Sequence, residues 1–99
     1  MSNGNIVHVV GTGTIGEPLI GLLCDAKTEL GIDEVTFYKH SPILTDRPKM
    51  KGLINRGANL AVRSDRLNDF QELGLEPVYG HEEAIKRASV VIDLSLIHI

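Results

Sequence analysis

A glycine-rich turn directly after a short apolar run most constrains how this chain can fold. The run is Ile6-Val7-His8-Val9-Val10, and the turn that follows it is Gly11-Thr12-Gly13-Thr14-Ile15-Gly16. The run is rich in β-branched residues and nearly continuous in apolar character, which is typical of a parallel strand covered on both faces. Strand, glycine turn and helix in this order are the context that a dinucleotide-binding turn requires.

Each glycine of the turn has a separate geometric role in such a site. Gly11 lets the chain leave the strand sharply, Gly13 lets a pyrophosphate approach the backbone, and Gly16 lets the new helix lie close to the strand. The free N–H groups and the positive dipole end of that helix then form an anion site. We therefore expect these glycines to bind a dinucleotide. The alternative is a glycine-rich turn that binds nothing.

Composition limits the classes of protein to which the chain can belong. Its 99 residues suffice for one domain, and 42% hydrophobic and 23% charged residues describe a globular protein. A net charge of -3 and few aromatic residues argue against nucleic acid as a partner. We find neither an apolar run long enough for a membrane span nor a signal peptide. The single cysteine, Cys24, excludes an intrachain disulfide and favours a cytoplasmic location.

The helix after the turn is predicted over residues 16–30. Its apolar residues recur at helical spacing, and Gly31 supplies a stop signal. We expect Cys24 to be a small core residue of this helix rather than a nucleophile. The stripe predicted to face the core consists of Leu19, Leu22, Leu23, Ala26 and Leu30.

Strands and helices alternate along the rest of the chain. Strands are predicted over 34–38, 59–62 and 90–93, with an edge segment over 77–79, a loop over 41–48, and helices over 49–55, 65–73 and 81–87. Such alternation favours parallel strands joined by right-handed crossovers. The sequence thus predicts an α/β fold, a Rossmann-type doubly wound parallel sheet.

The end of the second strand bears on the choice of cofactor. An NAD-binding turn usually carries an acid about 20 residues past the glycines, which accepts hydrogen bonds from the ribose 2′-hydroxyl. Here the segment is Tyr38-Lys39-His40-Ser41-Pro42, which contains no acid. A lysine with flanking donors suits a 2′-phosphate, so Lys39 and His40 favour NADP over NAD. The alternative is a solvated turn with an incidental lysine.

Two other histidines have simpler interpretations. His8 lies inside the first strand, where a histidine is more often a satisfied residue of the sheet than a ligand. His81 precedes the acidic first turn of the last predicted helix, and the sequence offers it no partners for a metal. We expect no metal site.

Four stretches together carry a resemblance to a known family. They are the glycine turn, Asn55-Arg56-Gly57-Ala58, Phe70-Gln71-Glu72-Leu73-Gly74-Leu75-Glu76-Pro77-Val78-Tyr79-Gly80, and the run from Glu83 through Ala88 to Val91-Ile92-Asp93. Over residues 5 to 93 the chain resembles the N-terminal half of archaeal-type (type II) glyceraldehyde-3-phosphate dehydrogenases. The glycine turn is shared by many reductases, and the stretch over 74–80 is the more specific part.

The resemblance implies further site residues. In that family the residues matching Thr14 and Ile15 contact the cofactor phosphates through their backbone. Lys39 matches a lysine in the turn around the adenosine ribose, and its neighbours match only loosely. Glu17 departs from the basic residue expected beside the motif. The implied reaction is phosphorylating oxidation of an aldehyde in glycolysis or gluconeogenesis, with hydride passing to NAD(P).

The resemblance also leads us to expect that this chain is a fragment. The family's catalytic cysteine lies beyond the fourth strand, in a segment followed by a catalytic domain. Residues 1–93 are therefore expected to form the NAD(P)-binding domain, without turnover, and residues 94–99 to be a tail of the kind produced when a sequencing read runs into adaptor. The alternative for the tail is a genuine strand at a sheet edge. The expected partners are the dinucleotide, the missing catalytic domain of the same chain and, in the intact enzyme, further copies of itself.

Other functions fit the same N-terminal architecture. One is another NAD(P)-dependent reductase, of the dihydrodipicolinate reductase or semialdehyde dehydrogenase type. A second is a non-enzymatic nucleotide-sensing module, which would usually carry an acid after the second strand.

Overall fold

A five-stranded, all-parallel sheet forms the centre of the part of the molecule that the structure describes. The computed structural model describes residues 5–11, 16–40 and 44–94. The strands lie in the order β4-β3-β2-β1-β5. Their bounds are β1 Ile6–Val10, β2 Glu34–Tyr38, β3 Ala58–Val62, β4 Tyr79–Gly80 and β5 Val90–Asp93. The predicted α/β class and parallel sheet are confirmed, and the arrangement is compatible with a Rossmann-like doubly wound fold.

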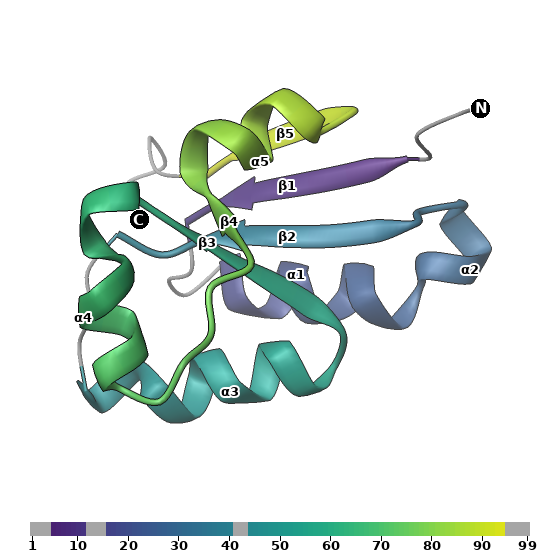
Figure 1. The fold of residues 1–99 in the computed structure, drawn as a ribbon. Helices are drawn as coiled ribbons and strands as arrows, with labels where there is room; N and C mark the ends of the chain where they lie inside the picture. Colours follow the sequence, from purple (N-terminus) through teal and green to yellow (C-terminus); the bar gives the residue numbers. More distant parts are fainter. Residues whose placement is uncertain (1–4, 12–15, 41–43, 95–99) are drawn as a thin grey trace.

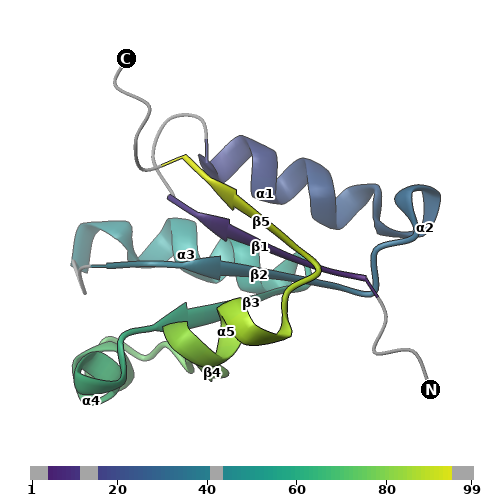
Figure 2. The ribbon, with the colours of Figure 1, turned by 90° about the horizontal axis from the view of Figure 1, so that it is seen from above.

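Helices cover both faces of the sheet (Figure 1). Helices α1 and α3 lie against one face, and α5 crosses the other on its way from β4 to β5 (Figure 2). The helices are α1 Gly16–Asp25, α2 Lys27–Leu30, α3 Arg47–Asn55, α4 Leu67–Glu72 and α5 His81–Arg87, with 3-10 turns η1 Leu44–Asp46 and η2 Ser64–Arg66.

The two faces of the sheet differ in chemistry, because side chains alternate along each strand. On the α1/α3 face, Val7 and Val9 of β1 lie opposite Val35 and Phe37 of β2 and join the apolar core. The α5 face instead carries polar side chains, including His8 and its register partner Thr36, both fully buried. A polar set this deep in the sheet must be satisfied internally.

The face of α1 that packs on the sheet differs from the predicted stripe. The buried side chains are those of Ile20 and Cys24, and Leu23 of the predicted stripe packs partly buried against the core. Leu22 is 62% exposed, and Leu30 also faces solvent. Gly16 starts the helix in contact with Gly11, so residues four and eight positions later point toward the sheet. The helix is apolar on more than one side, and its anchor point decides which side is buried. The prediction of a core position for Cys24 is confirmed.

Several predicted boundaries also change. The helix expected over 16–30 is broken at Ala26 into α1 and α2, and α2 ends at Gly31, which has a left-handed φ of 68°. α3 begins at Arg47, inside the expected loop, because Pro48 suits the first turn of a helix. The helix expected over 65–73 is shorter, since η2 occupies Ser64–Arg66 before α4.

Strand β5 lies at one edge of the described sheet. It pairs with β1, and the side chains of Val90 and Val91 are exposed on its two faces. The edge segment expected near Pro77 is found as β4 at the opposite edge, displaced to Tyr79–Gly80.

Candidate functional site

The strand order reverses at β1. After β1 the chain adds β2, β3 and β4 successively on one side, and α5 then returns it to place β5 on the other side. In open parallel sheets, the crevice outside the carboxyl ends of the strands at such a switch point is where ligands bind. The carboxyl ends of β1 and β5 are held together by the amide of Leu94, which donates to the Val10 carbonyl at 2.8 Å. The glycine turn begins at this point.

Two glycines of the turn have the geometry that their predicted roles require. Gly11 has a φ of 114°, which side chains rarely tolerate. A Cβ on Gly16 would lie 1.9 Å from the carbonyl oxygen of Gly11, so only glycine lets α1 start this close to the end of β1. The other predicted contacts, Gly13, Thr14 and Ile15, lie outside the described residues. The described part of the turn thus has the predicted strand-to-helix form.

Lys39 and His40 lie at the carboxyl end of β2, the neighbour of β1. The amide of Lys39 donates to the Ala61 carbonyl at 3.2 Å, which fixes the root of its side chain. Its ammonium group is not free, because Nζ lies 2.7 Å from Oδ2 of Asp46. His40 is exposed, and its Nδ1 shares a 3.0 Å hydrogen bond with the Tyr38 hydroxyl. The structure therefore places both residues beside the glycine turn, one strand away, and gives the lysine an acidic partner.

A cluster of rings lies under α5. The His8 Nδ1 and the Thr36 hydroxyl share a 2.5 Å hydrogen bond, and the His8 Nε2 lies 3.4 Å from Nδ1 of His81. The ring of His81 stacks on that of Tyr38 with centroids 3.9 Å apart. Burial, with a smaller contribution from His81, lowers the pKa of His8 from 6.5 to about 4, so this imidazole is neutral.

The prediction that His8 is a satisfied residue of the sheet is confirmed, but the cluster itself was missed. Burial also lowers the pKa of His81, although the nearby charges of Glu82 and Asp93 act in the opposite direction. A sequence signal existed. Side chains alternate along a strand, so His8 and Tyr38 lie on the same, polar face of the sheet. The connection from β4 to β5 crosses that face, and it carries His81 at the start of α5.

A second polar network lies on the α5 face and is structural in character. Glu34 Oε2 accepts hydrogen bonds from Asn59 Nδ2 and from the Tyr79 hydroxyl, both at 2.7 Å, and its Oε1 lies 3.2 Å from the Arg87 guanidinium. Burial alone raises the pKa of Glu34, but these three partners outweigh it and the pKa lies below its usual value. The network joins β2, β3, β4 and the end of α5.

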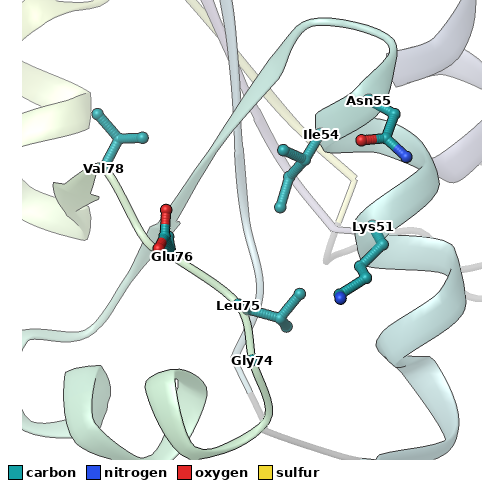
Figure 3. A pocket seen from close by; sticks show the side chains of 7 residues that line it. All are labelled: Lys51, Ile54, Asn55, Gly74, Leu75, Glu76 and Val78. Atoms are coloured by element: carbon teal, nitrogen blue, oxygen red, sulfur yellow. The ribbon is translucent and has the colours of Figure 1, made fainter.

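A separate pocket of about 390 Å³ lies between α3 and the loop before β4. Figure 3 shows the side chains of Ile54 and Lys51 from α3 and of Leu75 from the loop converging on it. It flanks the β3 and β4 side of the sheet, and none of the predicted site residues lines it. Its lining residues are Lys51, Ile54, Asn55, Gly74, Leu75, Glu76 and Val78.

Nothing in the described part of the chain forms a metal centre, since no three histidine, cysteine or carboxylate side chains converge there. Cys24 is buried in α1, and burial raises the pKa of its thiol, which disfavours the reactive thiolate. Over the same residues, no helix has the length and apolar character needed to cross a membrane.

Comparison of the chain with models of protein families, with curated proteins and with solved structures found no match.

Proposed function

We propose that this chain binds a nicotinamide dinucleotide, NADP or NAD, at the carboxyl edge of its sheet within a Rossmann-type fold. The observation that carries the proposal is the close contact of Gly16 with Gly11 at the end of β1. This contact brings the start of α1 to the point where the strand order reverses. Amide groups in the first turn of a helix have no partners within the helix and attract anions, so the pyrophosphate is placed there.

The second support is the position of the residues expected to hold the adenosine ribose. Lys39 and His40 directly follow β2, the strand next to β1, on the side where a dinucleotide extending from the turn places its ribose. Pyrophosphate and ribose sites that are neighbours across one strand spacing suit a single extended ligand. The pocket between α3 and β4 offers no comparable anion site at a strand end.

We further propose that the bound dinucleotide serves an aldehyde dehydrogenase of the type II glyceraldehyde-3-phosphate dehydrogenase kind, where it accepts hydride. The residues of this chain bind and orient the cofactor in that reaction. Cys24, the single cysteine of the chain, is a packing residue beneath the sheet and does not attack the aldehyde. Turnover of glyceraldehyde-3-phosphate by this chain that disappears in Cys24→Ser would contradict that assignment.

Titration of the full chain with NADPH and NADH, followed by nicotinamide fluorescence, tests the proposal. Gly13→Val is designed to obstruct the approach of the pyrophosphate to the turn, as the sequence motif predicts. Gly52→Ala is the matched control, because a Cβ on Gly52 of α3 meets nothing within 4 Å.

The expected result is saturable binding that Gly13→Val weakens at least about tenfold and that Gly52→Ala leaves unchanged. No binding of either dinucleotide to a folded chain would overturn the proposal. Equal binding by both glycine variants would show that the glycine turn is not the site.

A further inference from the structure

Asp46 holds the one lysine that the sequence offers to a 2′-phosphate. Its Oδ2 lies 2.7 Å from Nζ of Lys39, and only 16% of the Lys39 side chain and 26% of that of Asp46 are exposed. A pair this shielded interacts more strongly than a fully exposed one. Asp46 precedes α3 and makes no side-chain hydrogen bond that caps this helix.

The local structure favours this particular pairing. The Lys39 amide is fixed by its bond to Ala61, and η1 carries Asp46 back toward the end of β2. The adjacent cation, Arg47, is engaged elsewhere, because its Nε donates to the Leu73 carbonyl at 2.5 Å. Lys39 is therefore the cation paired with Asp46.

We infer that Asp46 sets the cofactor preference of this site by competing with the 2′-phosphate of NADP for Lys39. The inference rests on the proposed dinucleotide site. The end of β2 lacks the acid that accepts a ribose 2′-hydroxyl, and Asp46 brings a carboxylate to the same place from a later segment of the chain. Asp46 is thus a specificity-determining residue that sequence spacing alone does not identify.

The electrostatic consequences differ for the two cofactors. A 2′-phosphate is an anion that must share Lys39 with the carboxylate and is repelled by it. A 2′-hydroxyl is neutral and donates a hydrogen bond to the carboxylate, with no need to displace the lysine. The pair therefore reduces the NADP preference that Lys39 would confer on its own.

The experiment compares the dissociation constants of NADPH and NADH for the full chain and for three variants, Asp46→Asn, Lys39→Gln and the double variant. Asp46→Asn is expected to raise the affinity for NADPH relative to NADH by about tenfold. In the Lys39→Gln background, the same change is expected to shift the ratio clearly less than in the parent chain, because only the direct repulsion between Asp46 and the 2′-phosphate remains. The ratio is insensitive to partial unfolding, which lowers the apparent affinity for both cofactors equally.

Asp25→Asn is the matched control. It makes the same change of charge and removes a partner of Arg56, but at the far end of α1, nine residues after Gly16. It should leave the ratio unchanged.

Binding of both cofactors with the same ratio in the wild type and Asp46→Asn would overturn the role of Asp46 alone. If Asp46→Asn shifts the affinity ratio as much in the Lys39→Gln background as in the parent chain, the competition mechanism is wrong. Absence of binding in every variant would overturn the dinucleotide site itself.

Discussion

Acid should destabilise this protein through His8 well before its carboxylates titrate. The imidazole is fully buried against Thr36 and beside His81, and its pKa is lowered from 6.5 to about 4. The unfolded chain therefore takes up a proton near pH 6.5, whereas the folded chain resists protonation until about pH 4. Stability is fully present above pH 6.5 and is lost as the pH falls toward 4.

The size of this effect follows from the two pKa values. The whole difference corresponds to about 3 kcal/mol of unfolding free energy, of which about 2 kcal/mol is lost between pH 7 and pH 5. The lowered pKa of His81 acts in the same direction, so its contribution adds to the loss. Glu34, whose pKa also lies below its usual value, loses its contribution only at lower pH.

Urea denaturation followed by circular dichroism at pH 7, 6 and 5 measures the loss. His8→Gln removes the titrating group and keeps a partner for Thr36, so its stability should fall by about 2 kcal/mol less than that of the wild type over this range. His40→Gln, which removes an exposed imidazole, is the control and should follow the wild type.

An equally steep pH dependence in His8→Gln would refute the reasoning. If that variant does not fold, NMR titration of the His8 ring in the wild type decides instead. A midpoint near 6.5 would contradict the burial argument, and one near 4 would support it.

Two further predictions concern the packing of α1 and the network around Glu34. Ile20→Ala should destabilise the protein by about 2–5 kcal/mol in urea denaturation, whereas Leu22→Ala should cost less than about 0.5 kcal/mol, because only Ile20 of the two is buried in the core. Similar losses would contradict the orientation of α1 in the structure. Tyr79→Phe should cost about 1.5 kcal/mol at pH 7 by removing a donor to the Glu34 carboxylate, and Tyr38→Phe, which loses a bond to exposed His40, should cost less than about 0.5 kcal/mol. Equal effects of the two tyrosine variants would contradict a structural role for the Glu34 network.

Local signals predicted much of the fold. Glycine stops and β-branched runs were sufficient for β1, β2 and α5, whose bounds agree with the expected ones. The prediction of which face of α1 is buried was wrong for most of the stripe, because the helix is apolar on several sides. The contact between Gly16 and Gly11 decides the rotation of the helix about its axis. Such a contact depends on tertiary structure, which helical periodicity does not record.

The candidate site was only partly accessible from the sequence for the same reason. The turn and the lysine after β2 are local patterns and were found. The pairing of Lys39 with Asp46 and the stacking of His81 on Tyr38 join segments 7 and 43 positions apart, respectively, and depend on how η1 and α5 return to the sheet. No spacing rule for these residue types predicts either contact.

The most direct test of a dinucleotide at the carboxyl edge of the sheet is an amide NMR titration of the ¹⁵N-labelled chain with NADP⁺. The expected result is that perturbed signals cluster at Gly11, Gly16 and Lys39, around the end of β1 and β2, while Asn55 and Leu75 of the pocket in Figure 3 stay unchanged. Perturbations centred on that pocket, or none at millimolar ligand, would contradict the proposed site.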